Sequence, residues 1–350
     1  MTTETDSLET PETIDTVAVI GAGSWGTALS ILLSRNGKRV RLWAYEPELV
    51  RIIQNTRENA FFLPGYTLPD SIEVSHDMAA VLRDARFIVL VAPTQTIRGV
   101  LETARPYISP NAILVGASKG IENDTLMRVS EIVAEVLGKD ICIRYLALSG
   151  PTFATGVARG LPATAVVAGN DLDAAELAQR VFFDKTFRVY VNDDVIGVEL
   201  GGALKNVIAI AAGILAGLDL GSNARAALIT RGLWEITRLG AALGARLITF
   251  QGLTGMGDLV LTCDGTESRN FKVGFRIGRG EKLEAIQKSM RMVAEGVKTT
   301  LSVRELADRH GVEMPITEQV YQVLYHGKSP RQAVWELMTR TLKSEHQTDI

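Results

Sequence analysis

The period of apolar and polar positions changes near residue 193. Before that point, short β-branched runs alternate with segments of helical periodicity. Such alternation predicts a mostly parallel, doubly wound sheet. We predict strands at 17–20, 39–44, 86–91, 112–115, 144–148, 163–168 and 187–191. The helices between them are predicted from 24 onward and at 47–55, 94–104, 124–137 and 171–182.

From residue 195 onward the periodicity is helical and the strand signal almost disappears. We therefore predict an all-α second domain over 193–340 that follows a nucleotide-binding domain over 16–192. The polar residues 1–15 and 341–350 read as disordered tails. A ligand cleft is expected between the domains, at the carboxyl ends of the strands. Helices are predicted at 195–218, 224–243, 271–279, 285–290, 299–310, 315–325 and 330–338.

A glycine turn follows the first predicted strand, in the sequence TVAVIGAGSWG at residues 16–26. Gly21 permits a tight turn, Gly23 lets a pyrophosphate approach the backbone, and Gly26 lets the next helix pack closely on the strand. The free N–H groups of that helix would face the phosphates. The pattern favours a dinucleotide site over the alternative, a plain strand–helix turn.

The charges near the second strand leave the choice between NAD and NADP open. Glu46 stands at the end of this strand, where a carboxylate can bind a ribose hydroxyl and favour NAD. Four nearby cations could instead meet a 2′-phosphate, and each could equally be a solvated surface charge: Arg35, Lys38, Arg39 and Arg51.

Lys205 is the most informative single residue of the second domain. It is the only cation between Arg188 and Arg225, within a helix of small and apolar residues. A lysine there either extends its ammonium group to the surface or is buried. Burial lowers the pKa of an ammonium group toward the range useful for proton transfer. The glycines at 201 and 202 leave space for a ligand or a second backbone.

Histidine-based hydride transfer is disfavoured, because none of the four histidines lies in a glycine-bearing motif or at a sheet edge. We therefore expect the catalytic base to be a lysine. A second lysine, Lys119, follows a predicted strand and could meet an anionic substrate or the cofactor, or simply be exposed. Gly150 and Thr152 follow another strand and could bind an oxygen-rich ligand; alternatively, Pro151 between them only rigidifies a turn.

Two further polar groups precede predicted helices or apolar runs. Asp258, between glycine and an apolar run, could orient Lys205 or bind a substrate hydroxyl, and its simpler role is a helix cap. Ser268, Arg269 and Asn270 begin a predicted helix, where backbone N–H groups, a guanidinium and an amide suit a phosphate. Ordinary capping would leave Arg269 unexplained.

Composition narrows the classes of partner. The 350 residues carry a net charge of −3 without a block of like charges, which argues against nucleic-acid and membrane-surface partners. No apolar run reaches membrane-spanning length; the longest candidate, 207–218, is too short and contains glycines. Cys142 and Cys263 have no metal-like spacing and read as reduced cysteines of a cytoplasmic protein, so no metal is expected.

The motifs GAGSWGTAL, SKGIE, SGPTFA, GGALKNVIAI, ITRGL, GDLVLTC, SRN and VAEGVKT occur in that order. This set resembles bacterial NAD(P)-dependent sn-glycerol-3-phosphate dehydrogenases from about residue 16 to 338. The resemblance implies a Rossmann-type domain followed by a helical domain like the C-terminal domain of 6-phosphogluconate dehydrogenase. It also implies reversible reduction of dihydroxyacetone phosphate to sn-glycerol 3-phosphate, which supplies glycerophospholipid synthesis.

The resemblance implies roles for individual residues. Lys205 would be the proton acceptor and would also bind substrate. The other substrate-binding residues would be Lys119, Gly150, Thr152, Asp258, Ser268, Arg269 and Asn270. The cofactor, NAD or NADP, would be bound by Gly21, Gly23, Ser24, Trp25, Gly26, Tyr45, Lys119, Ala154, Arg269, Val293 and Glu295.

Two alternatives and the oligomeric state remain open from the sequence. A related β-hydroxyacid dehydrogenase would share the plan and the lysine but would prefer a carboxylate ligand. A non-catalytic dinucleotide-sensing protein would need only the glycine turn, leaving Lys205, Asp258 and Arg269 unexplained. The sequence does not fix the assembly, and a homodimer is our expectation.

Overall fold

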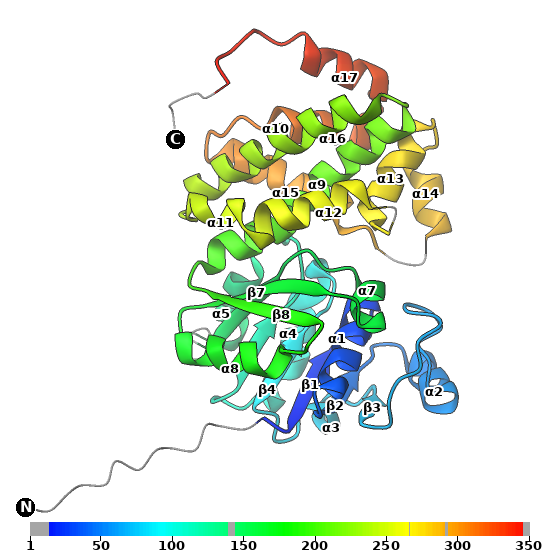
Figure 1. Ribbon diagram of the computed structural model, residues 1–350, viewed down its shortest axis with the longest axis vertical. Coiled ribbons are helices and arrows are strands. Elements are labelled where there is room, and N and C mark those ends of the chain that lie inside the picture. The colour runs from blue at the N-terminus through cyan, green and yellow to red at the C-terminus, as the bar shows by residue number, and fades with distance from the viewer. Residues whose placement is uncertain (1–13, 139–143, 266, 291–292, 346–350) are drawn as a thin grey trace, which may run out of the picture.

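The computed structural model describes residues 14–138, 144–265, 267–290 and 293–345, and its first part is built on an eight-stranded sheet (Figure 1). The strand order is β3-β2-β1-β4-β5-β6-β7-β8. Neighbouring strands are parallel except β6 and β7, which confirms the predicted mostly parallel sheet. The strands are β1 (Thr16–Ile20), β2 (Arg39–Trp43), β3 (Ile72–Ser75), β4 (Phe87–Leu90), β5 (Ile113–Gly116), β6 (Tyr145–Ser149), β7 (Ala163–Gly169) and β8 (Phe187–Asn192).

Helices cover both faces of this sheet, so its central strands are buried on both sides. Successive side chains of a strand point to opposite faces, and β1 shows the result. Val17 and Val19 belong to a core with α1 and α8, whereas Ala18 and Ile20 belong to a core with α3, α4 and α5. The helices of this part are α1 (Ser24–Arg35), α2 (Pro47–Thr56), α3 (Met78–Leu82), α4 (Ile97–Ala104), α5 (Val129–Leu137), α7 (Ala154–Arg159) and α8 (Leu172–Phe182), with short 3-10 turns η1 (Thr94–Thr96) and η2 (Arg105–Tyr107).

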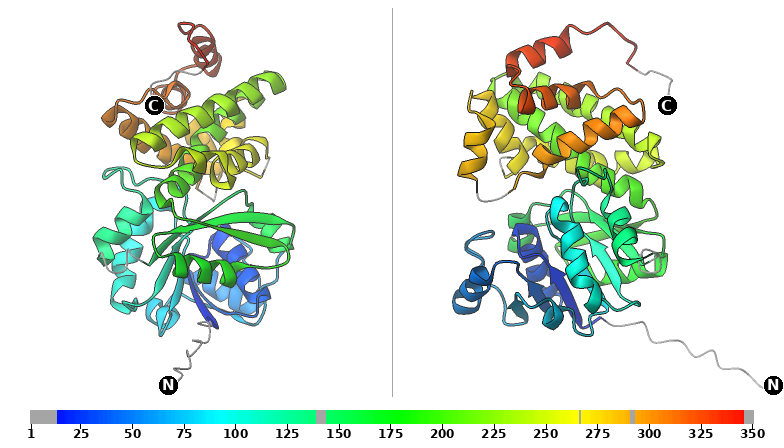
Figure 2. Two further views of the ribbon diagram at one scale, coloured as in Figure 1. Left: turned by 60° about the vertical axis from the view of Figure 1, so that its left-hand side comes forward. Right: turned by 180° about the vertical axis from the view of Figure 1, so that it is seen from behind.

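The second part is entirely helical in the residues that the structure describes and stacks on one end of the sheet (Figures 1 and 2). Its central helix α9 is long and apolar enough to cross a membrane, but 89% of its most apolar window is buried inside the protein. It is therefore a core helix here. The elements are α9 (Val195–Gly217), α10 (Gly221–Ala242), α11 (Leu247–Gln251), the π-helix η3 (Leu253–Gly257), α12 (Asp258–Asp264), α13 (Arg269–Gly278), α14 (Leu283–Ser289), α15 (Glu295–Arg309), α16 (Pro315–Tyr325) and α17 (Pro330–Met338).

The structure differs from the predicted elements in several places, among them the start of α15 at Glu295 rather than 299 and the short helix α3, which was not predicted. Helix α5 begins at Val129 rather than 124, because Leu126 has a positive φ and Arg128 caps the helix. The sequence pattern predicts neither the four-residue strand β3 nor the short elements between 247 and 264. Predictions for 1–13, Cys142 and 346–350 lie outside the described residues.

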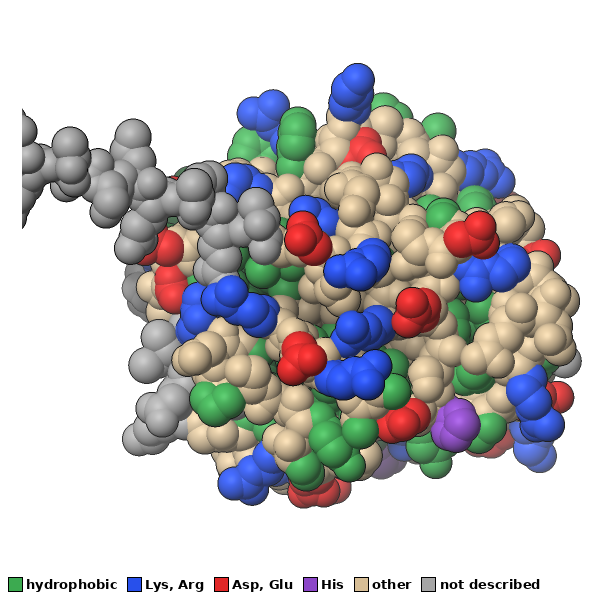
Figure 3. Space-filling model, turned by 90° about the horizontal axis from the view of Figure 1, so that it is seen from below, with side chains coloured by type: hydrophobic (Ala, Val, Ile, Leu, Met, Phe, Trp, Pro, Cys, Tyr) green, Lys and Arg blue, Asp and Glu red, His purple; other side chains and the backbone are tan. Residues whose placement is uncertain are grey.

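The surface of the sheet end farthest from the helical part is seen in Figure 3. Lysine and arginine side chains on this face are interspersed with aspartate and glutamate (Figure 3). This face therefore presents no uniform field of one sign, in keeping with the mixed charge pattern along the chain.

Candidate active site

The glycine turn after β1 has the geometry that a dinucleotide requires. Gly21 has a φ of +119°, and a Cβ there would lie 2.8 Å from the carbonyl oxygen of Val91. A Cβ on Gly26 would overlap the carbonyl oxygen of Gly21, so α1 begins in direct contact with the turn. Gly23 faces open space within 4 Å. The turn thus leaves room for a phosphate next to the first N–H groups of α1, and it fits the expected cofactor.

The other residues expected at the cofactor lie around this turn on different elements. Ser24 begins α1 and donates its hydroxyl to the carbonyl oxygen of Phe62 at 2.6 Å. Trp25 follows, and its buried indole N–H has no partner among the described residues. Tyr45 lies just beyond β2 and is 76% exposed. Ala154 begins α7, which packs against α1.

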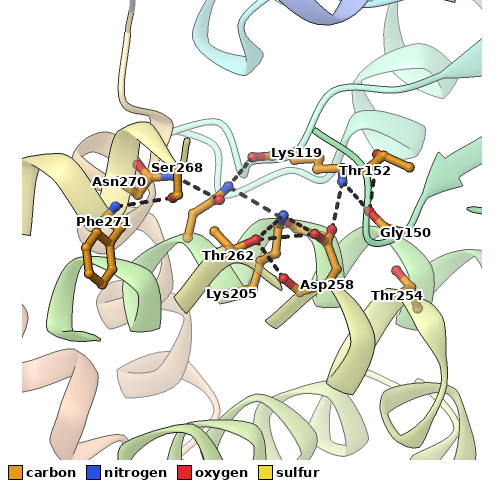
Figure 4. Close-up of polar contacts among 12 residues, drawn as sticks. Lys119, Gly150, Thr152, Lys205, Thr254, Asp258, Thr262, Ser268, Asn270 and Phe271 are labelled. Carbon is orange, nitrogen blue, oxygen red and sulfur yellow. Dashed lines mark hydrogen bonds and ion pairs between the residues drawn. The ribbon is translucent and has the colours of Figure 1, made fainter. Parts of the chain in front are cut away.

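One carboxylate joins the two lysines that the sequence singled out (Figure 4). Lys205, on α9, is 6% exposed and forms an ion pair with Oδ1 of Asp258, which is completely buried at the start of α12. Lys119 approaches from the loop after β5, and its Nζ lies 2.7 Å from Oδ2 of the same carboxylate. Its Nζ also donates to the carbonyl oxygen of Gly150 at 3.1 Å. Both parts of the chain therefore contribute to one charged cluster.

Burial sets the protonation of Lys205. The pKa of Lys205 falls from its ordinary value of 10.5 to about 8, chiefly because the ammonium group is removed from water, and the neighbouring Lys119 contributes to the lowering. The ion pair with Asp258 acts in the opposite direction and raises the pKa. The result is a lysine that can exist as either amine or ammonium near neutral pH, as a proton-transfer residue requires.

Thr262 completes the environment of Lys205, although the sequence prediction omitted it. Its hydroxyl accepts a hydrogen bond from Nζ of Lys205 at 2.8 Å and donates to the backbone carbonyl oxygen of Asp258 at 2.6 Å. Asp258 and Thr262 are four residues apart on α12 and share one helix face. Recognising the apolar run after Asp258 as a helix would have revealed this pairing.

The two glycines before Lys205 allow close packing on both sides of α9. A Cβ on Gly201 would lie 2.7 Å from the carbonyl oxygen of Thr254 in η3. A Cβ on Gly202 would lie 2.7 Å from the hydroxyl of Ser149 at the end of β6. The sequence left open whether this space serves a ligand or a second backbone. At Gly201 the described residues show the close approach of a second backbone.

The SRN segment at the start of α13 is only partly free for a ligand. Ser268 caps the helix by accepting a hydrogen bond from the N–H of Phe271 at 3.2 Å. Asn270 donates to Oδ1 of Asn206 at 2.9 Å and accepts from the N–H of Gly296 at 2.9 Å. The ordinary capping role is thus present, and Asn206, which the sequence prediction omitted, links this segment to the lysine cluster.

Arg269 differs from its two neighbours because the described residues give it no ion-pair partner within 4 Å. Its side chain is exposed to solvent, yet the surrounding protein lowers its pKa by desolvation. Glu295 attracts the guanidinium electrostatically from the start of α15. A guanidinium without an ion-pair partner can bind an anionic ligand.

Glu295 connects the helical part to the sheet. It accepts hydrogen bonds from the N–H of Thr94 at 3.0 Å and from the Thr94 hydroxyl at 3.1 Å. Burial raises the pKa of Glu295. Thr94 follows β4, and no sequence motif marked it. Val293, two residues before Glu295, is 52% exposed.

The described residues offer neither a reactive thiol nor a metal site. Burial raises the pKa of the Cys263 thiol to about 12, which keeps it protonated and unreactive. Among the described residues, no three His, Cys, Asp or Glu side chains are grouped so that they could hold a metal ion.

Comparison with known proteins decides the family. The model of the NAD-dependent glycerol-3-phosphate dehydrogenase N-terminus matches residues 16–175, and the model of the C-terminus matches residues 194–335. The chain belongs to the NAD-dependent glycerol-3-phosphate dehydrogenase family. This assignment confirms the resemblance found in the motifs and the enzyme class, an oxidoreductase.

Individual glycerol-3-phosphate dehydrogenases match over nearly the whole chain. Glycerol-3-phosphate dehydrogenase [NAD(P)+] of Syntrophotalea carbinolica is 55% identical over 329 residues, which cover 94% of this chain and 99% of that protein. The enzyme of the same name from Geobacter sulfurreducens is also 55% identical, covering 94% and 98%. The crystal structure of glycerol-3-phosphate dehydrogenase from Coxiella burnetii has a TM-score of 0.89 at 40% identity and covers 93% of this chain and 99% of that one.

Proposed function

We propose that the protein catalyses the reversible NAD(P)H-dependent reduction of dihydroxyacetone phosphate to sn-glycerol 3-phosphate, and so supplies glycerophospholipid synthesis. The observation that carries this proposal is the row of groups at the carboxyl ends of adjacent strands. Gly21, Thr94, Lys119 and Gly150 follow β1, β4, β5 and β6, which are neighbours in the sheet in that order. The row runs from the dinucleotide turn to the Lys119–Asp258–Lys205 cluster.

Lys205 is the proton-transfer residue in this account. When bound along the turn, the dinucleotide supplies or takes the hydride at the substrate C2. In the oxidation direction, the neutral amine of Lys205 accepts the proton of the C2 hydroxyl. In the reduction direction, its ammonium form donates that proton to the developing alkoxide. Asp258 and Thr262 fix the position of Nζ.

The phosphate of the substrate is bound at the start of α13. Arg269 supplies the charge, and Ser268 and Asn270 stand on either side of it in the chain. Binding energy from this remote group helps to position the reacting carbon. Lys119, Gly150 and Thr152 line the side of the substrate site opposite α13. When Lys205 gives up its proton, the ion pair with Lys119 still balances the negative charge of Asp258.

We also propose a cytoplasmic homodimer. Support comes from apolar side chains that the described single chain leaves in solvent on α17, where Trp335 is 65% and Met338 is 78% exposed. Burial of such surface favours association. Light scattering of the purified protein would give twice the chain mass if the proposal holds, and the chain mass of 37.9 kDa if it does not.

Absorbance of NADH and of NADPH with dihydroxyacetone phosphate tests the reaction directly. We expect oxidation of at least one cofactor with dihydroxyacetone phosphate and little with dihydroxyacetone, because Arg269 requires the phosphate. Oxidation with a β-keto acid and not with the phosphate ester would identify the related β-hydroxyacid dehydrogenase. Binding of dinucleotide without turnover of either class would identify a sensing protein.

A further inference from the structure

Glu199 is a buried carboxylate that the reaction does not use. It lies on α9, six residues before Lys205, and the four hydrogen bonds that it accepts among the described residues all come from the nucleotide-binding part. Oε1 accepts from the N–H of Ser130 at 2.8 Å and from the hydroxyl of Tyr145 at 2.8 Å. Oε2 accepts from the Ser130 hydroxyl at 2.6 Å and from Nη1 of Arg128 at 2.8 Å. Each oxygen thus accepts two hydrogen bonds, from groups at the start of α5 and from β6.

The sheet is shaped to make this contact. Tyr145 is the first residue of β6, and its ring crosses over β5 toward α9. A Cβ on Gly116, the last residue of β5, would overlap the Tyr145 hydroxyl. Gly116 therefore provides the space through which the Tyr145 hydroxyl reaches Glu199. Such a contact is more than an accidental surface ion pair, because three elements meet at one buried carboxylate.

Strand β6 contacts α9 at both of its ends, and the proposed active-site groups lie just beyond its carboxyl end. Tyr145 at its beginning bonds to Glu199, and Ser149 at its end lies against Gly202. The next residue, Gly150, accepts a hydrogen bond from Lys119. Six residues of helix rise about 9 Å, so the Glu199 contact determines how far Lys205 extends past the carboxyl edge of the sheet.

We propose that Glu199 is a positioning residue that sets the register of α9 against β6 and thereby places Lys205 opposite the reacting carbon. This inference rests on the proposed function. Glu199→Gln replaces one acceptor oxygen by an NH₂ group, which must face a donor on Ser130, Arg128 or Tyr145. One bond or more is then lost, and α9 is free to shift. Tyr145→Phe removes a single donor and leaves the carboxylate with Ser130 and Arg128.

Glu235 offers a matched control. It is also a buried carboxylate, 3% exposed, and accepts from the N–H of Ile316 at 2.6 Å and from Thr317. It joins α10 to α16 within the helical part and has no contact with β6 in the described residues. Glu235→Gln therefore perturbs the same chemistry without moving α9 against the sheet.

The test compares kcat, KM and melting temperature of the full-length variants. We expect Glu199→Gln to lower kcat by about tenfold to a hundredfold, with Tyr145→Phe intermediate. KM for dihydroxyacetone phosphate and Kd for the dinucleotide should stay within about twofold. Glu235→Gln should lose melting temperature but keep its kcat. An unchanged kcat in Glu199→Gln, or in Tyr145→Phe should the first variant fail to fold, overturns the proposal.

A crystal structure of Glu199→Gln separates this inference from the proposed function. We expect α9 to be displaced along β6 and the contact between Lys205 and Asp258 to lengthen, whatever the substrate is. An α9 in its original register contradicts the positioning role. A wild-type protein that does not turn over dihydroxyacetone phosphate contradicts the proposed function instead.

Discussion

At the scale of the residue, the account depends on a lysine held at the boundary between two protonation states. Lys205 is buried among small and apolar side chains of α9, and its ion pair with Asp258 prevents complete loss of the proton. Lys119 shares that carboxylate, so the pair of lysines competes for one counter-charge. The balance leaves the pKa of Lys205 at about 8.

The two reaction directions should therefore depend oppositely on pH. Oxidation needs the neutral amine, whose fraction grows as pH rises through about 8, so its kcat should rise. Reduction needs the ammonium form, so its kcat should fall over the same interval. Measurement of kcat in both directions between about pH 6.5 and 9.5 checks these opposite pH dependences, with the dinucleotide Kd as the control. Parallel profiles in the two directions would contradict it.

The sequence pattern singles out Lys205 and Asp258 more readily than the residues that contact them. Lys205 stands out because charge is rare within an apolar helix, and Asp258 because glycine precedes it. Thr262 and Asn206 carry no such contrast with their surroundings, and only the packing of α12 and α13 on α9 reveals their contacts. For Ser268 the sequence cannot separate two roles, because a helix cap and a phosphate-binding residue require the same residue type.

At the scale of the element, the strand–turn–helix unit at β1 and α1 makes separate demands on its glycines. Gly26→Ala should cost about 1–3 kcal/mol of stability, because its Cβ would meet backbone that cannot move aside. Gly23→Ala should keep the melting temperature but weaken dinucleotide binding at least about tenfold, since its Cβ would fill the phosphate space.

Gly99→Ala is the control for both variants. Gly99 lies within α4 and also faces open space, so neither stability nor binding should fall. Calorimetric melting and fluorescence titration with NADH measure the two quantities. Normal dinucleotide binding by Gly23→Ala would remove the turn from the cofactor site.

Element boundaries were predictable where side-chain pattern and chain geometry agree. The long helices α9, α16 and α17 match their predicted ranges within a residue or so, because their apolar periodicity continues to a cap or a proline. Strand β3 was missed because four residues with two buried side chains are too few to establish a period. The antiparallel pairing of β7 with β6 has no local signal and follows from packing alone.

At the scale of the whole molecule, the two parts share their cores. Val198 of α9 packs into the core on one face of the sheet, and Ile121 and Leu126 from the loop after β5 pack into the helical core. Hydrogen bonds accepted by the carboxylates of Glu199 and Glu295 join the same two parts. The proposed catalytic groups from both parts are therefore held in one arrangement.

This interlocking predicts cooperative unfolding. Neither core remains complete when the other part unfolds, so scanning calorimetry should show one transition with a van't Hoff enthalpy equal to the calorimetric enthalpy per cooperative unit. The dinucleotide should raise its midpoint by binding only the folded state. Two resolved transitions, of which the dinucleotide shifts only one, would contradict the shared cores.

The most direct test of the central claim is the turnover number of Lys205→Met with dihydroxyacetone phosphate. Methionine keeps the approximate length of the side chain and its apolar stem, but it has no group that can transfer a proton. We predict a kcat reduced by roughly 100-fold or more relative to wild type, with dinucleotide Kd unchanged because the glycine turn is intact. Near-normal turnover of Lys205→Met would show that another group transfers the proton.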